Sequence, residues 1–224
     1  MLFRSAVFDA DWASAPAAKY AALDRNACLA EAKARGIPLE EVKSAPGVLI
    51  PVRLTGPVNG VRYHTELAEK DRATSPFEVF DCRLVLALHD FGAILTAHDI
   101  DEALIFSAWR PPPKSWAKDK LGTRHTGALA VDIRVLNRSA TATNKDKDLI
   151  VLRDWKPARD KPPCGDKAPA ISPDTDAAKE IRAIYCAASD ARIFSSMLGP
   201  NFNKEHENHF HLEVTPDVKW RLTE

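Results

Sequence analysis

Three histidines fall within six positions near the C-terminus, in the stretch HENHFHLE at residues 206–213. Successive side chains of a β-strand point to opposite faces, so His209, His211 and Glu213 would share one face and the intervening apolar residues the other. Burying such a polar face would leave several groups unpaired unless a metal ion or water satisfied them. The stretch therefore predicts a strand with its apolar side in the core and its polar side in a cleft.

A second set of candidate ligands lies in RHTGALAVDI, residues 124–133. His125 comes just before an alternating run, and Asp132 lies on the polar face of that run. Gly127 permits a tight backbone path, and small neighbours leave room beside the carboxylate. His125, Asp132 and one histidine of the C-terminal pair would match the ligands of a catalytic zinc ion with one position open. The alternative is that Asp132 is a solvated strand residue and His125 a loop residue.

Three segments have the composition and spacing of helices. Residues 17–35 are rich in helix formers with one apolar face, and Gly36 follows as a stop. Residues 77–92 return to helical spacing and end at Gly92. A further helix is predicted from Ser172, a capping residue that is followed by a proline and by acidic residues in the first turn.

Four segments have the pattern of strands. Residues 128–135 alternate cleanly, and residues 103–109 form a buried run that ends at three prolines. Shorter strands are predicted over 149–155 and 208–214, and an Asn-Gly pair at 59–60 predicts a hairpin turn. Strands and helices do not alternate regularly. We therefore predict an α+β fold whose mainly antiparallel sheet carries the metal site and is flanked by helices.

Length and charge limit the functional classes. The 224 residues can bury a substantial core, and we expect an N-terminal extension over residues 1–16 and one catalytic domain over residues 17–224. With 31 basic and 31 acidic residues the formal net charge is zero, so no nucleic-acid or anionic-membrane partner is predicted. No apolar run approaches the roughly 20 residues of a membrane span, and the first residues do not match a secretory signal.

The four cysteines are widely spaced and include no Cys-x-x-Cys pair. Zinc-ribbon ligation is therefore disfavoured, and four cysteines allow three disulfide pairings. Two interpretations remain from composition, namely two disulfides in an exported protein or four buried thiols. The residues concerned are Cys28, Cys82, Cys164 and Cys186.

The two ligand stretches, in this order, resemble the zinc peptidase superfamily that includes D-alanyl-D-alanine peptidases, lysostaphin-type enzymes and the hedgehog signalling domain. Within it, the chain is most similar to the bacterial extensin-like C-terminal domain family. The similarity extends from about Cys28 to Val214 and covers most of the chain. The matching stretches are CLAEAKARGI, GVLIPVRL, FDCRLVLALHDFG, RHTGALAVDI, LIVLRDW and MLGPNFNKEHENHFHLEV.

The resemblance implies roles for individual residues. His125, Asp132 and His211 would bind one zinc ion, and His209 would be free to hydrogen-bond the zinc-bound water or the developing charge. Arg110, in the motif SAWR, is nominated to hold the scissile carbonyl oxygen or a substrate carboxylate. The alternative for this arginine is an ordinary salt bridge at the end of a strand.

Further positions around the site follow from the same resemblance. Thr123 stands where relatives commonly carry a serine, two residues before the first ligand, and it still offers a hydroxyl to a substrate. Trp109, beside the nominated arginine, is a second candidate substrate contact. The catalytic glutamate of some relatives is not matched, because Glu207 would lie on the opposite strand face from His211. His206 is interpreted as a solvated loop histidine.

The implied reaction is hydrolysis of amide bonds in peptidoglycan stem peptides or cross-links, by a zinc-dependent endopeptidase or carboxypeptidase that is periplasmic or secreted. An exported protein favours disulfides, with Cys28 paired to Cys82 and Cys164 to Cys186, each joining a helix to a neighbouring segment. Two alternatives stay open. One is a zinc-containing module that binds the cell wall or has a structural role without catalysis, and the other is a hydrolase of a different amide.

Overall fold

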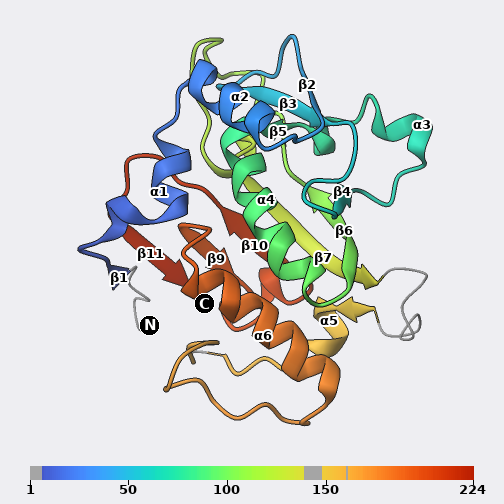
Figure 1. Ribbon diagram of the computed structural model, residues 1–224, viewed down its shortest axis with the longest axis vertical. Coiled ribbons are helices and arrows are strands. Elements are labelled where there is room, and N and C mark those ends of the chain that lie inside the picture. The colour runs from blue at the N-terminus through green and yellow to red at the C-terminus, as the bar shows by residue number, and fades with distance from the viewer. Residues whose placement is uncertain (1–6, 139–147, 160) are drawn as a thin grey trace.

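The computed structural model describes residues 7–138, 148–159 and 161–224 (Figure 1). Helices and strands are both abundant and most strand pairs are antiparallel, so the predicted α+β class is confirmed. Within these residues the larger sheet has eight strands and the smaller sheet three. No helix in the described ranges is long and apolar enough to cross a membrane.

Two of the three metal ligands predicted from the sequence, Asp132 and His211, lie on the larger sheet. In spatial order, its strands are β1 (Val7–Phe8), β11 (Trp220–Thr223), β9 (Ser196–Leu198), β10 (Phe210–Glu213), β7 (Ala130–Arg138), β6 (Ile100–Ser107) and β4 (Arg62–His64), with β8 (Leu149–Ile150) paired to β7. The smaller sheet consists of β2 (Leu39–Glu41), β3 (Pro51–Leu54) and β5 (Phe80–Asp81).

Helices connect and cover these strands. The α-helices are α1 (Pro16–Ala21), α2 (Arg25–Ala34), α3 (Glu69–Arg72), α4 (Cys82–Thr96), α5 (Val151–Asp154) and α6 (Asp176–Asp190). Short 3-10 turns are η1 (Trp12–Ser14), η2 (Pro76–Glu78), η3 (Arg124–Gly127) and η4 (Lys204–His206).

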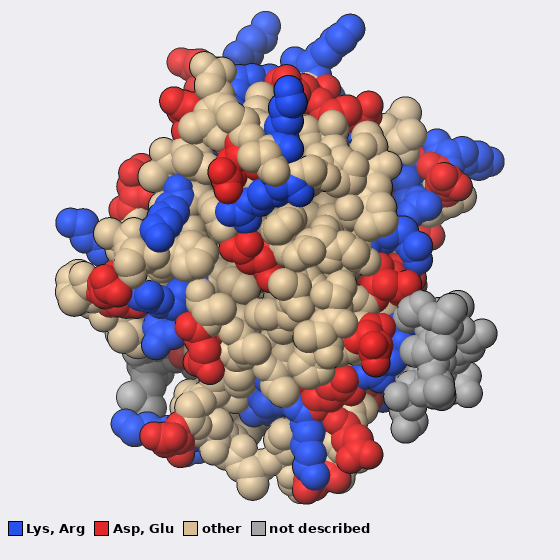
Figure 2. Space-filling model, in the orientation of Figure 1, with Lys and Arg blue, Asp and Glu red and all other residues tan. Residues whose placement is uncertain are grey.

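The two long helices, α4 and α6, pack against one face of the larger sheet (Figure 1). Val131 and Ile133 of β7, together with Phe210 and Leu212 of β10, belong to the same buried core as the apolar residues of these helices. Alternation along a strand then sends the intervening polar side chains to the opposite face. On the face of the molecule that carries these helices, basic and acidic side chains are interspersed around the rim, and the central area is largely uncharged (Figure 2).

The helix predicted over residues 17–35 is two helices. The first, α1, begins with Pro16 at its first position, and the second, α2, begins after Asp24, whose side chain accepts a hydrogen bond from the Ala27 backbone N–H at 2.9 Å. This capping bond starts a new helix and explains the break. The predicted stop is confirmed, since Gly36 has φ +66° immediately after α2.

The helix predicted over residues 77–92 begins later and does not end at Gly92. The side chain of Asp81 caps α4 by accepting from the Arg83 backbone N–H, and the helix continues to Thr96. A side chain at position 92 would bring a Cβ atom to 2.9 Å from the Val58 carbonyl oxygen. Gly92 is therefore required by the close packing of a neighbouring turn and not by a helix end.

That neighbouring turn is the predicted Asn-Gly turn. Asn59 and Gly60 both have positive φ, and Val58 and Val61 exchange backbone hydrogen bonds of 2.8 and 3.1 Å. The turn is confirmed, but the flanking strands do not form a hairpin. Strand β3 pairs with β2 and β5, whereas β4 runs parallel to β6 in the larger sheet.

Two other predicted elements differ from the structure. The strand expected over residues 149–155 stops at Ile150, because the Asp154 side chain accepts from the Ile150 backbone N–H at 2.7 Å and the chain turns into α5. The helix expected from Ser172 begins at residue 176, where Thr175 is the capping residue, and Ser172 precedes a cis proline. Strands β6, β7 and β10 confirm the other three predicted strands with shifted ends.

Both predicted disulfides are present. Cys28 of α2 is bonded to Cys82 at the start of α4, and Cys164 is bonded to Cys186 of α6. The described part of the expected extension also packs on the fold, since β1 pairs with β11 and Trp12 is buried.

We expect the Cys28–Cys82 bond to contribute more stability than Cys164–Cys186. They close loops of 54 and 22 residues, and chain entropy gives about 4 and about 3 kcal/mol respectively. Each pair replaced by alanines should lower the free energy of unfolding by these amounts in denaturant titrations. Equal losses, or a larger loss at the shorter loop, would contradict this entropic ranking.

Candidate metal centre

Strand pairing brings two of the predicted ligands together. Asp132 in β7 and His211 in β10 are directly opposite each other in the antiparallel register. Leu212 and its neighbours fix this register, because a shift by one residue would move the apolar side chains out of the core. Residues 79 positions apart in the sequence thus become neighbours on the face that the long helices leave free.

The third ligand comes from the turn that precedes β7. His125 lies in η3, and both the first residue of η3, Arg124, and the residue that follows it, Ala128, have positive φ. Gly122 and Gly127 pack backbone against backbone, with room for no side chain, since a Cβ atom at Gly122 would come within 2.4 Å of Thr126. This tight path, part of which the sequence anticipated at Gly127, turns the His125 ring toward the sheet.

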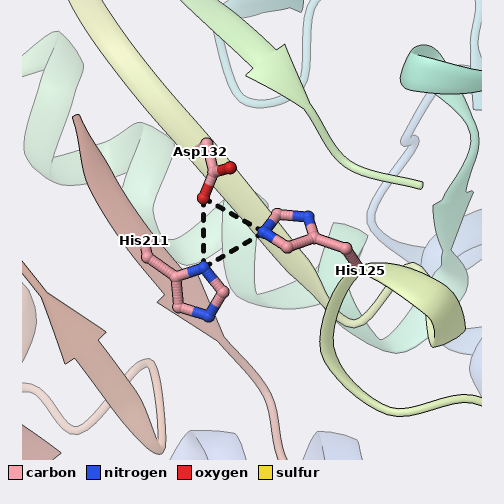
Figure 3. Close-up of side chains that lie close together, drawn as sticks. All are labelled: His125, Asp132 and His211. Atoms are coloured by element: carbon pink, nitrogen blue, oxygen red, sulfur yellow. Dashed lines mark hydrogen bonds and ion pairs between the residues drawn. The ribbon is translucent and has the colours of Figure 1, made fainter. Parts of the chain in front are cut away.

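The three side chains point at one another (Figure 3). The His125 Nε2 atom lies 3.1 Å from Asp132 Oδ1 and 3.1 Å from His211 Nδ1, and the last two atoms are 3.0 Å apart. All three residues are at least nine-tenths buried. Together they form the group suited to hold a metal ion within the described ranges.

In each imidazole, the partner of the outer nitrogen, the one that faces away from the triad, decides whether the inner nitrogen carries a proton or a lone pair. His125 Nδ1 lies 2.8 Å from the Ala108 carbonyl oxygen, which only accepts, so Nδ1 donates and a neutral ring has its lone pair on Nε2. His211 Nε2 lies 3.4 Å from Glu213 Oε2, which makes Nε2 the donor and leaves the lone pair on Nδ1. Two lone pairs and the Asp132 carboxylate therefore face one another, and this arrangement calls for a cation between them.

The spacing also fits such a cation. Ligand atoms at 2.0–2.1 Å from a tetrahedral ion are about 3.3 Å apart, close to the 3.0–3.1 Å edges of this triangle. Hydrogen bonds from the outer ring nitrogens to a carbonyl and a carboxylate are the usual support of histidine ligands. The residues present thus fit a divalent metal ion bound by His125, Asp132 and His211.

Glu213 has a role that the sequence did not reveal. Its carboxylate is 4% exposed, approaches His211 with Oε2 and accepts from the Thr215 hydroxyl with Oε1 at 2.9 Å. Thr215 is held in turn by Ser195 at 2.8 Å. The signal was its place on the polar face two positions after His211. The carboxylate of Glu207 is exposed instead.

His209 lies beside the ligand triad. Its Nε2 atom is 3.5 Å from Asp132 Oδ1, and its Nδ1 atom is 2.9 Å from the side-chain oxygen of Asn208. An amide oxygen accepts, so Nδ1 donates and the lone pair of the neutral ring is on Nε2, the atom nearer the centre. Burial lowers the pKa of His209 against the opposing effect of the Asp132 charge, and His211 and Arg110 lower it further, which favours the neutral ring.

The interpretation of His206 as a solvated loop residue is wrong. Its ring is half-buried, 5.1 Å from the ring of His209, and its Nδ1 atom lies 2.6 Å from the side-chain oxygen of Asn203. Burial and the neighbouring histidines His209 and His211 lower the pKa of His206 to about 4. Asn203, three residues earlier, also caps η4, a pattern that could have indicated the ordered turn.

Arg110 forms the salt bridge that was the alternative to a substrate role. One terminal nitrogen contacts Asp132 Oδ2, and Nε donates to the Ser107 hydroxyl at 2.9 Å. The side chain is nevertheless 53% exposed, so part of the guanidinium faces outward beside the ligand carboxylate. Arg110 therefore lies beside the candidate metal centre and contacts Asp132 Oδ2, whereas the imidazoles approach Oδ1.

The two expected substrate contacts differ in exposure. Thr123 is exposed at the start of η3, two residues from His125, as a contact residue must be. Trp109 is only 8% exposed and packs in a small buried cluster with Val48 and Val79. Its indole N–H finds no hydrogen-bond partner among the residues that the structure describes. The ring therefore supports the end of β6 from inside.

Opposing effects set the protonation of the ligands. Burial alone would raise the pKa of Asp132, but the adjacent imidazoles of His125 and His211, whose protonated forms donate to its carboxylate, hold it well below its usual range. Burial alone would lower the pKa of His211, but Asp132 and Glu213 raise it above its ordinary value. The ligand carboxylate is thus ionised at all working pH values, while a proton competes for His211.

Comparison of the chain with protein-family models, with curated proteins and with solved structures finds no match.

We expect the protein to bind one divalent ion per chain, and His125→Ala, Asp132→Ala and His211→Ala each to lose stoichiometric binding. Each of these changes removes one of three ligands, whereas Glu213→Gln, which removes only the charge that orients His211, should weaken binding by roughly 10- to 100-fold. Zinc titration against a chromophoric chelator gives the affinities. His98→Ala, whose ring pairs with Glu180 outside the site, is the control. Unchanged metal affinity in all three triad variants would exclude a metal site at His125, Asp132 and His211.

Metal affinity should fall as pH decreases from about 8 to about 5, because protonated imidazoles cannot ligate. The raised pKa of His211 means that this loss begins above the ordinary histidine value of about 6.5. The same chelator competition, repeated at each pH, measures the effect. An affinity independent of pH over this range would exclude imidazole ligands.

Proposed function

We propose that the protein is a zinc-dependent peptidase of the extensin-like C-terminal domain family that hydrolyses amide bonds in peptidoglycan stem peptides or cross-links. The observation that carries the proposal is the convergence of His125 Nε2, Asp132 Oδ1 and His211 Nδ1. Two imidazoles and a carboxylate, with a fourth position left for water or substrate, are the donor set of a catalytic zinc. A closed structural site would use four protein ligands.

A zinc ion held there would supply Lewis-acid polarisation of a carbonyl and a bound water with a pKa near 7. The protein groups around the triad complement that chemistry. His209 is neutral and has its lone pair on Nε2, so it can accept a proton or a hydrogen bond from an attacking water. Arg110 presents an exposed guanidinium that can hold the carbonyl oxygen as negative charge develops.

The substrate class comes from the family resemblance, and two features support the setting. Two disulfides, Cys28–Cys82 and Cys164–Cys186, are typical of proteins folded in an oxidising compartment, which supports a periplasmic or secreted location. A neutral formal charge offers no general attraction to polyanions, so the substrate must be recognised by local contacts at the centre.

Zinc-loaded protein should release soluble peptide fragments from purified sacculi, and His211→Ala should abolish release. His209→Ala should keep the metal but slow release by roughly 100- to 10,000-fold, because it removes only proton transfer. Mass spectrometry of the products identifies the cleaved bond, and the metal content of each variant is measured in parallel. His98→Ala should behave as wild type.

Two results would replace the proposal. Zinc-dependent binding to sacculi with no fragment released would favour a non-catalytic wall-binding module. Release of fragments only from unrelated peptides would assign a hydrolase of a different amide. In either case the metal titration of the triad variants tests metal binding independently of peptide hydrolysis.

A further inference from the structure

An exposed aromatic ring lies next to the metal centre. Phe106, in β6, is 39% exposed, although its neighbours in the strand, Ile105 and Ser107, are buried. The ring of His209 meets it edge to face with 5.7 Å between centroids. Since His209 itself lies 3.5 Å from the ligand Asp132, the phenyl ring is one side chain away from the triad on the same face of the sheet.

A guanidinium lies over the same ring. The central carbon of the Arg134 guanidinium is 5.2 Å from the Phe106 ring centre, and one of its terminal nitrogens contacts Glu66 just after β4. The Glu66 side chain is 59% exposed. An ion pair so open to water contributes little by itself, so a carboxylate of a bound molecule can replace Glu66.

The chemistry of this pair defines its ligand. An aromatic face takes aliphatic groups, and a guanidinium takes a carboxylate through two parallel hydrogen bonds. Successive residues of an extended peptide are about 3.3–3.6 Å apart, so a peptide with its carbonyl at the triad places a side chain one or two residues away over Phe106. Both groups lie within reach of one substrate side chain.

We propose that Phe106 and Arg134 form a substrate subsite that binds a peptide side chain with an aliphatic stem and a terminal carboxylate. This inference rests on the proposed peptidase function, because it assigns a specificity to the same centre. The phenyl ring packs against the stem, and Arg134 exchanges Glu66 for the substrate carboxylate.

The test uses zinc-loaded protein and blocked peptides that differ in one side chain, placed in turn at the two positions on either side of the scissile amide. The side chain is linear and ends in a carboxylate, a methyl group or an ammonium. Affinity is measured by isothermal titration and turnover by chromatography of the products. Wild type should prefer the carboxylate peptide about 10-fold over the methyl peptide and more over the ammonium peptide.

The variants separate the two contacts. Arg134→Gln should remove most of the carboxylate preference and leave the methyl peptide unaffected, whereas Arg134→Glu should favour the ammonium peptide. Phe106→Ala should weaken the carboxylate and methyl peptides alike by about 10-fold, and Phe106→Leu should restore part of this loss. Matched controls are Phe8→Ala, an exposed phenylalanine on β1, and Arg25→Gln, whose exposed partner is Glu41. Thermal unfolding confirms that each variant is folded.

The outcomes test the subsite proposal and the peptidase proposal separately. Peptides bound in the expected order but never hydrolysed support the subsite and overturn the peptidase proposal. Hydrolysis that ignores the side-chain charge, in wild type and in Arg134→Gln alike, supports the peptidase and overturns the subsite. The subsite is also overturned when wild type binds none of the peptides or when Phe8→Ala weakens them as much as Phe106→Ala.

Discussion

The site depends on the mutual approach of three hydrogen-bond acceptors. The outer nitrogens of His125 and His211 are occupied by the Ala108 carbonyl oxygen and the Glu213 carboxylate, so both rings turn a lone pair toward Asp132. Without a cation, only a shared proton can stabilise these three acceptors, and the pKa of His211 is raised for this reason. A divalent ion stabilises them better, since one charge centre interacts with all three atoms at once.

The fold keeps the three ligand atoms close together because the larger sheet has one apolar face, packed on helices, and one polar face. Val131, Ile133, Phe210 and Leu212 fix β7 and β10 against α4 and α6, and this packing sets the register that puts Asp132 opposite His211. The ligand positions are thus backed by the main core, and only the His125 turn is held by close backbone packing instead. The disulfide at Cys28 ties α2 to the start of α4, so the helix layer behind the site is also cross-linked.

The face that carries the ligands continues beyond them. Arg110 lies beside Asp132, and His209 leads to Phe106 and then to Arg134, which forms a path of partly exposed polar and aromatic groups across β7 and β6. A chain with balanced charge gains no long-range attraction to a substrate, so recognition depends on such local groups. Under the proposed function, the metal centre would act on the amide, and the adjoining side chains would select the peptide that binds there.

The sequence by itself determined the α+β class and, with the choice between His209 and His211 open, the candidate ligands, because strand alternation and residue type are local properties. The family resemblance supplied the choice of His211 and the pairing of the two disulfides. The sequence did not determine where hydrogen bonds to the side chains of Asp24, Asp81 and Asp154 would start a new helix, since each competes with a pattern that continues past it. Only the tertiary structure decided that Glu213 is held against His211 through Thr215 and Ser195 and that Trp109 is buried, since both depend on how distant segments pack.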